Sequence, residues 1–249
     1  MIVARVGEAG RMPSWPAALV LVRHGESLGN VANAAAYAAK ADRLDLTVND
    51  PSVELSDLGV RQAQALGKRV GDLAEDEQPD VVLVSPYVRA HQTADHILAT
   101  AGLEGLPRHT DERLRDREQG LLDRMTWYGV RAHYPEEAER RAHLGKFWYR
   151  PPGGESWADV AQRVRDVLRD LRLDHAGRHL LVVSHDVPIL MHRYVLEALT
   201  PEEAVGLSGQ VRNCALTVYR GRAHGMDLEV FNDVTPVEED PEATVTAHE

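Results

Sequence analysis

Residues 17–27 read AALVLVRHGES, and this stretch determines the fold class expected for the 249-residue chain. The apolar run Ala17–Val22 stops at a charged Arg-His-Gly turn, as a strand buried on both faces does when it enters a loop. Asp80–Ser85 (DVVLVS) and His179–Ser184 (HLLVVS) repeat this order, and Asn213–Tyr219 and Leu228–Phe231 are weaker strand candidates. Continuously apolar strands are typical of parallel sheets that helices cover on both sides.

Helical patterns fill the intervals between these strands. Ser56 is expected to cap a helix whose apolar positions continue to Leu73 at helical spacing. Pro86 is expected in the first turn of a second helix, Glu155–Leu173 forms a third, and a fourth follows His185. Strands that alternate with helices predict an α/β protein, a three-layer α/β/α sandwich with a mostly parallel central sheet.

The chain shows no repeat and no flexible linker, so we expect a single domain with its core at about 17–234. Residues 1–16 are expected to be an irregular leader, and 235–249 an acidic and flexible tail. Residues 121–150 are expected to form a helical lid insertion. Its aromatic residues are interpreted mainly as ordinary packing, whereas Arg150 is the best lid candidate for contact with a substrate.

Composition excludes several classes of function. The chain has 28 Lys and Arg against 39 Asp and Glu, a formal charge of −11, which disfavours nucleic-acid and anionic-membrane partners. Cys214 is the only cysteine, so neither an intramolecular disulfide nor a cysteine-rich zinc site can form. The twelve histidines include no HExxH pattern, so we expect no metal and no cofactor. The N-terminal residues lack the order of a signal peptide, and a cytoplasmic location is expected.

Three polar segments follow the three strongest strands: Arg23-His24-Gly25, Ser85–Arg89 and Ser184-His185-Asp186. Each alone is equally consistent with an ordinary strand-end turn or a solvent-facing arginine. Together they bring two arginines and two histidines to the carboxyl edge of one sheet, where open α/β sheets bind ligands. A guanidinium offers a planar fork to phosphate oxygens, and a neutral imidazole can attack phosphorus. The pattern therefore predicts a phosphate site.

Six segments resemble, in order, the motifs of one known family, the histidine phosphatase superfamily, also called phosphoglycerate mutase-like. They are LVRHGESLGN (Leu21–Asn30), LSDLGVRQAQALG (Leu55–Gly67), SPYVRAHQTA (Ser85–Ala94), ERLRDREQG (Glu112–Gly120), PPGGESWADVAQRV (Pro151–Val164) and VVSHDVPI (Val182–Ile189). The resemblance implies the phosphoglycerate mutase-like fold over most of the chain.

The resemblance also implies roles for individual residues. His24 corresponds to a nucleophile that forms a phosphohistidine, and Arg23, Arg89 and His185 correspond to groups that hold the phosphoryl group. Ser27 and Asn30 are expected in the substrate pocket.

Two residues are candidates for the proton donor, because the family usually has Glu where Leu114–Gly120 (LRDREQG) has Asp116. Glu118 lies two residues further on and would face the same side in an extended segment. Register to Gly120 favours Asp116, and Glu118 is kept as the alternative.

We expect a phosphomonoester hydrolase that acts through phosphohistidine on a small phosphorylated metabolite, without a metal. The residues 33–53 lack the W-D stretch of the related mutases, and Ser184-His185-Asp186 stands where mutases have G-H-G. The alternatives are a phosphoglycerate mutase-type phosphotransferase and a non-catalytic phosphate-binding module. A homodimer is possible, and the sequence does not identify the substrate.

Overall fold

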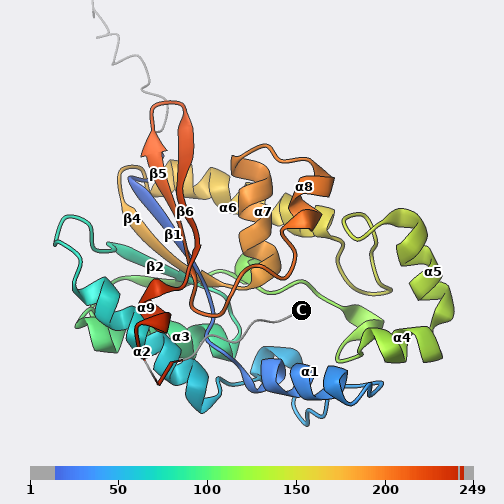
Figure 1. Ribbon diagram of the computed structural model, residues 1–249. Helices are drawn as coiled ribbons and strands as arrows, with labels where there is room; N and C mark the ends of the chain where they lie inside the picture. The colour runs from blue at the N-terminus through green and yellow to red at the C-terminus, as the bar shows by residue number, and fades with distance from the viewer. Residues whose placement is uncertain (1–14, 241, 244–249) are drawn as a thin grey trace, which may run out of the picture.

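The computed structural model describes residues 15–240 and 242–243, and six strands within these residues form one sheet (Figure 1). The sheet order is β3-β2-β4-β1-β5-β6. The first four strands in this order are parallel, whereas β5 and β6 are antiparallel additions at one side. The strands are β1 (Ala18–Arg23), β2 (Val81–Val84), β3 (Arg108–Thr110), β4 (His179–Ser184), β5 (Leu216–Arg222) and β6 (Gly225–Asp233).

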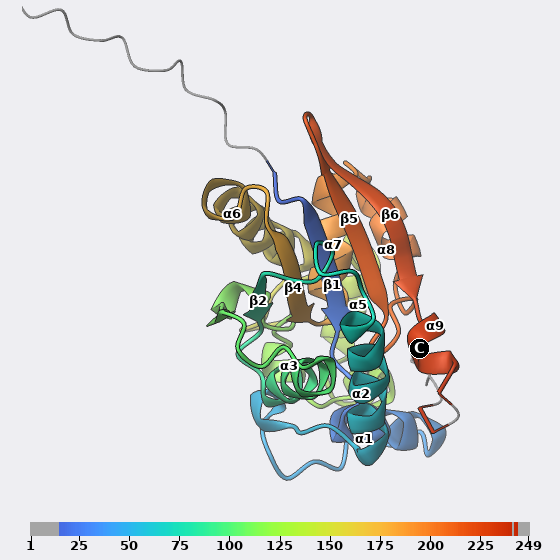
Figure 2. The same cartoon turned by 90° about the vertical axis from the view of Figure 1, so that its left-hand side faces the viewer.

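Helices cover both faces of the sheet and confirm the predicted three-layer fold. One face packs against α2 and α3, and the other packs against α6 and α7 (Figure 2). The helices and helical turns are α1 (Leu28–Ala38), η1 (Asp50–Ser52), α2 (Asp57–Gly71), α3 (Val88–Ala101), η2 (Glu112–Leu114), η3 (Gly120–Leu122), α4 (Trp127–His133), α5 (Pro135–Leu144), α6 (Trp157–Asp174), α7 (Asp186–Leu196), α8 (Pro201–Gly206) and α9 (Thr235–Glu238).

The central strand β1 shows why an unbroken apolar run fits this position. Leu19 and Leu21 point to the layer that contains Trp157, whereas Val22 points to the layer of α2 and α3. Because successive side chains of a strand face opposite sides, a strand between two helical layers needs apolar residues throughout. Fully burying each such side chain contributes about 1.5–3 kcal/mol to folding.

Helix starts follow the sequence signals except at Pro86. Ser56 caps α2 by accepting a hydrogen bond from the Gly59 amide, and Ser156 caps α6 in the same way through Asp159. By contrast, α3 begins at Val88 with Tyr87 at the N-cap, so Pro86 lies before the helix and not in its first turn. The short strand β3 was missed, because its residues Arg108–Thr110 are exposed and polar.

Residues 121–150 contain the helical pair α4 and α5, which lies away from the sheet in Figure 1. A small cluster that includes Leu122, Val130 and Tyr149 holds this pair together. Thr126 connects it to the segment after α1, since its amide donates to Asp42 O at 3.0 Å and its hydroxyl donates to Ala41 O at 2.5 Å.

The two ends of the chain differ in what the structure describes. Of the expected leader, residues 1–14 lie outside the described residues. Of the expected flexible tail, residues 241 and 244–249 also lie outside the described residues. Residues 235–240 are described, and they are not the irregular segment that the sequence predicted. They contain α9, which packs on α2, and its Val237 is fully buried in the apolar cluster that also contains Ala65 and Leu66.

Candidate active site

The carboxyl ends of β1, β2 and β4 lie at one edge of the sheet. Arg23 is in register with Ser184, and Val84 is in register with Val183. The His24 amide donates a hydrogen bond to Ser184 O at 3.0 Å, which fixes the first turn residue against the neighbouring strand. The three polar segments predicted from the sequence therefore meet at this edge.

Gly25 allows the turn after β1 to contact the start of α2. A Cβ atom on Gly25 would lie 2.5 Å from Gly59 O, and one on Gly59 would lie 2.0 Å from Glu26 O. Both distances are far below van der Waals contact, so each position needs a residue without a side chain. The close approach also lets the Glu26 amide donate to Gln62 at 2.8 Å, which anchors the turn.

The His24 ring is buried and its two nitrogens are distinguished by their neighbours. Nδ1 lies 2.7 Å from Gly25 O, a carbonyl that can only accept, so Nδ1 carries the proton. This leaves a lone pair on Nε2, to which Arg89 Nε donates at 3.2 Å. The backbone therefore holds His24 in the tautomer in which Nε2 is nucleophilic.

Two buried nitrogen atoms beside His24 have no hydrogen-bond partner among the described residues: Arg23 Nε and His185 Nδ1. Arg23 is fixed by Nη1, which donates to Val211 O at 2.6 Å. His185 packs edge-on against His24 with ring centroids 5.1 Å apart. Because buried polar atoms in proteins are almost always satisfied, two such atoms beside one imidazole indicate a site for an acceptor-rich ligand.

His185 is surrounded by positive charge. Burial lowers its pKa well below the ordinary value, and Arg89, His24 and Arg23 lower that pKa further. Its Nε2 lies 2.8 Å from Ser85 Oγ, which can donate to it. The neutral ring then carries its proton on Nδ1, the atom without a hydrogen-bond partner. An anion bound at Nδ1 would favour the protonated ring.

Asp116 lies between the arginine and the second histidine. Its Oδ2 is 3.4 Å from Arg89 Nη2 and 3.6 Å from His185 Nδ1. The pKa of Asp116 is raised to about 7. Burial is the largest cause, the negative charges of Asp186 and Asp50 also raise the pKa, and the positive charge of Arg89 lowers it. A carboxyl group with this pKa is present in both protonation states near neutral pH.

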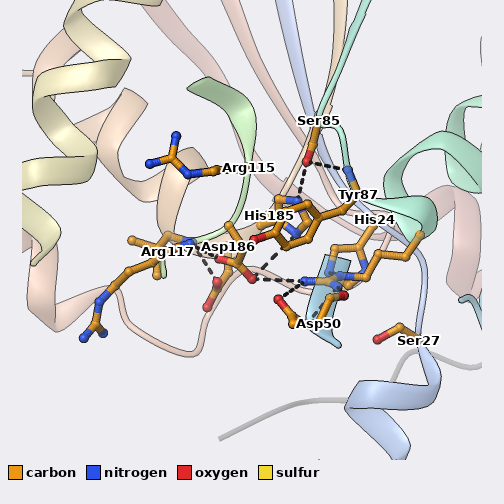
Figure 3. A network of polar contacts seen from close by, with 12 residues as sticks. His24, Ser27, Asp50, Ser85, Tyr87, Arg115, Arg117, His185 and Asp186 are labelled. Carbon is orange, nitrogen blue, oxygen red and sulfur yellow. Dashed lines mark hydrogen bonds and ion pairs between the residues drawn. The ribbon is translucent and has the colours of Figure 1, made fainter. Parts of the chain in front are cut away.

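Asp50 and Tyr87 were not identified from the sequence, although both contact Arg89. Arg89 Nη1 donates to Asp50 O at 2.8 Å and Oδ1 at 3.0 Å, and Nη2 donates to Oδ2 at 3.3 Å. The Arg89 guanidinium carbon also lies 4.9 Å from the centroid of the Tyr87 ring, which packs edge-on against His185. Figure 3 shows His24, Asp50, Tyr87 and His185 gathered at this place.

A cavity of about 290 Å³ opens from these residues toward the lid, and its wall contains Arg23, His24, Arg89 and Asp116. Three further groups of residues line the same cavity. They are the polar Asn33 and Gln119, the charged Arg117, Asp123 and Arg124, and the apolar Leu44, Leu46, Leu122, Met125, Trp127 and Val130. The cavity therefore offers both charged and apolar contacts beyond the two histidines.

Ser27 and Asn30 also line the cavity, but their side chains serve the start of α1. Ser27 Oγ accepts from the Asn30 amide at 3.2 Å, and Asn30 Oδ1 accepts from the Ser27 amide at 3.0 Å. Asn213 Nδ2 donates to His24 O at 2.8 Å and lies 3.4 Å from Asn30 Oδ1. This network links the helix start to the His24 backbone.

The structure does not bring Glu118 and Arg150 into the cavity wall. The Glu118 side chain is 46% exposed and accepts a hydrogen bond from the Tyr87 hydroxyl at 3.0 Å. The Arg150 side chain is 61% exposed and forms an ion pair with Asp159 on α6. Asp159 is the N3 residue of the capping box that starts α6, and its carboxylate also accepts from Arg150. The sequence analysis did not anticipate this pair.

An α/β sandwich with two histidines and two arginines at the carboxyl edge of its sheet is typical of enzymes that act on phosphate esters. Comparison with known families leads to the same class. Residues 19–234 match the histidine phosphatase superfamily (branch 1), and the chain belongs to this family. The match covers the sheet from the second residue of β1 onward and every cavity-lining residue named above.

Individual relatives are named either as mutases or as phosphatases. A 2,3-bisphosphoglycerate-dependent phosphoglycerate mutase of Allorhizobium ampelinum is 34% identical over 198 residues, which is 76% of this chain and 84% of that protein. A mycobacterial glucosyl-3-phosphoglycerate phosphatase has a TM-score of 0.67 and 27% identity, covering 86% of this chain and 98% of the other. An Escherichia coli protein described as a putative alpha-ribazole-5'-P phosphatase shares the fold, with a TM-score of 0.71, 22% identity, and coverage of 88% and 97%.

Proposed function

We propose that the protein is a phosphomonoester hydrolase that acts through a phosphohistidine on His24. The observation that carries this proposal is the pair of buried nitrogen atoms without hydrogen-bond partners among the described residues, Arg23 Nε and His185 Nδ1, at the site of an oriented His24. A phosphoryl group has enough oxygen acceptors to satisfy both atoms, and its negative charge matches the surrounding cations.

In the first step, the His24 Nε2 lone pair attacks phosphorus and the bond to the leaving oxygen breaks. Arg23, Arg89 and His185 then stabilise the charge on the non-bridging phosphoryl oxygens. Asp116 is the proton donor in this proposal, because its pKa of about 7 keeps it partly protonated near neutral pH. Its proton goes to the departing oxygen, which leaves as an alcohol.

In the second step, water attacks the phosphohistidine and free phosphate leaves. Asp116, now a carboxylate, accepts the proton of that water, so the same group returns to its initial state. The Asp116 side chain is 24% exposed, which gives water access to it. This access supports transfer to water, and His24 regains its lone pair when the N–P bond breaks.

The residues that balance charge in this mechanism are arginine and histidine side chains, so we propose that hydrolysis needs no metal and no cofactor. Among the described residues, no group of three or more His, Cys, Asp or Glu side chains is arranged to hold a metal ion. Likewise, within residues 15–240 and 242–243 no helix combines the length and apolarity required to cross a bilayer. A cytoplasmic location remains part of the proposal.

The substrate is proposed to be a small phosphorylated metabolite. The cavity of about 290 Å³ lies at the lower end of the usual range for small-molecule sites. Arg117 lines its outer part, and its Nε donates to Glu155 O at 2.7 Å without an ion pair to a carboxylate in the described part of the chain. This supports a leaving group with polar or anionic character.

A mutase activity is the second candidate, and one observation favours it. The curated relatives with 31–34% identity are named 2,3-bisphosphoglycerate-dependent phosphoglycerate mutases. Such an enzyme would transfer the phosphoryl group from His24 to a second hydroxyl instead of water. A solved relative that supports hydrolysis is the mycobacterial phosphatase at 27% identity.

The test is a screen of phosphomonoesters that measures free phosphate, run in parallel with an assay for interconversion of 2- and 3-phosphoglycerate. We expect phosphate release from at least one small ester, and no interconversion with or without 2,3-bisphosphoglycerate. His24→Ala is the matched inactive control. Interconversion without phosphate release would contradict hydrolysis and support the mutase.

A further inference from the structure

Asp50 occupies a position at the candidate site that the mechanism above does not use. It begins the helical turn η1 in the segment between α1 and α2, and its carboxylate lies against both terminal nitrogens of Arg89. Its backbone carbonyl also accepts from Arg89 Nη1 at 2.8 Å. The same Nη1 and Nη2 atoms form the fork with which an arginine binds phosphoryl oxygens.

We propose that Asp50 is a positioning residue that orients Arg89 and competes with phosphoryl oxygens for its guanidinium, which weakens the binding of the product phosphate. This inference rests on the proposed function, since it assigns Arg89 to phosphate binding. The Asp50 side chain is 40% exposed, so it can move toward solvent when a phosphoryl group takes its place on the guanidinium.

Arg89 is held by more than Asp50. Its Nε donates to His24 Nε2 at 3.2 Å, its guanidinium stacks over Tyr87, and its Nη2 reaches Asp116 at 3.4 Å. Removing the negative charge of Asp50 while keeping its shape therefore leaves Arg89 in place. The guanidinium then has one fewer anion beside it and binds a phosphate more strongly.

Asp50 also affects Asp116, because its negative charge is one of the causes that raise the Asp116 pKa. Charged and titratable groups face Asp116 from several elements: Arg89 on α3, Tyr87 before it, His185 after β4, Asp186 on α7, the adjacent Arg117, and Arg163 on α6, which donates to the Asp116 carbonyl. Neutralising Asp50 lowers the Asp116 pKa. The proton donor is then lost at a lower pH, so the alkaline limb of the kcat/KM profile moves to lower pH.

The experiment compares wild type with Asp50→Asn, an isosteric change, and titrates each with inorganic phosphate by calorimetry at pH 7. We expect Asp50→Asn to bind phosphate about fivefold more tightly, the effect of one nearby charge that is partly screened by solvent. Asp45→Asn is the matched control: it makes the same charge change in the same segment at an exposed residue outside the cavity wall, and should bind phosphate as wild type does.

Asp50→Ala separates charge from orientation, because alanine cannot accept a hydrogen bond from Arg89. We expect it to lower kcat severalfold below that of Asp50→Asn, while both variants move the alkaline limb. Both keep the backbone carbonyl that contacts Arg89, and thermal unfolding verifies the fold of each. Phosphate binding by Asp50→Asn that equals or falls below that of wild type would overturn the proposal.

The titration requires no turnover, so its failure can be told apart from a failure of the proposed hydrolysis. Tighter phosphate binding by Asp50→Asn in a protein that hydrolyses no ester would uphold the role of Asp50 and refute hydrolysis.

Discussion

Asp116→Asn tests the proposed proton donor through its dependence on the leaving group. An aspartic acid with the ordinary pKa of 3.8 would be protonated in fewer than about one in a thousand molecules at pH 7, whereas a pKa of about 7 makes this about one half. The site therefore raises the protonated fraction nearly a thousandfold. Asparagine cannot donate this proton, so kcat/KM for an alkyl phosphate should fall about 10²–10⁴-fold.

The assay measures kcat/KM for an alkyl phosphate and for p-nitrophenyl phosphate, whose leaving group needs no proton. We expect less than about a tenfold loss for the nitrophenyl ester, with accumulation of phosphohistidine because the second step also needs the carboxylate. Glu118→Gln is the matched control and should show neither effect, since Glu118 contacts the Tyr87 hydroxyl outside the cavity wall. Equal losses on both esters in Asp116→Asn would refute the reasoning, and a reversal between the two variants would identify Glu118 as the donor.

Three further predictions concern wild type and the lid. In wild type, kcat/KM for alkyl phosphates should decline above about pH 7. The Asp116 pKa is raised to about 7, so the proton donor is lost as pH rises through this value. A flat pH-rate profile from about pH 6 to 9 would contradict this. Arg150→Ala should leave KM within about twofold of wild type, since Arg150 pairs with Asp159 away from the cavity, and a tenfold rise in KM would show a substrate contact. Exhaustive chelation should leave activity intact, and a loss that one divalent cation restores would point to a metal-dependent enzyme.

The fold could be predicted from the sequence where the signals are local and strong. The apolar runs of β1, β2 and β4 and the capping residue Ser56 each determine an element by short-range physics. Two elements that depend on tertiary contacts were not predicted: the strand β3 and the helix α9, whose residues were expected to form a flexible tail. The exposed strand β3 pairs with β2 but has no apolar pattern, and α9 is a four-residue helix whose one local signal, Pro236 at its start, does not indicate that it packs on α2.

The candidate site could be predicted where residues directly follow strands, because parallel topology brings strand ends together. This rule placed Arg23, His24 and His185 at one edge, and Arg89 joined them from the first turn of α3. Asp50 could not be found in this way. It reaches Arg89 from a loop 39 positions away, and its Asp-Pro sequence indicates only a helical turn.

The central claim is that His24 carries the phosphoryl group during turnover. The most direct measurement is rapid acid-free quenching of the protein with a phosphomonoester substrate, followed by mass spectrometry under alkaline conditions that preserve phosphohistidine. We predict one phosphoryl group on His24 in wild type, more of it in Asp116→Asn, and none in His24→Ala. Phosphate release by wild type with no phosphorylated His24 under any quench time, or a phosphoryl group on another residue, would contradict the account.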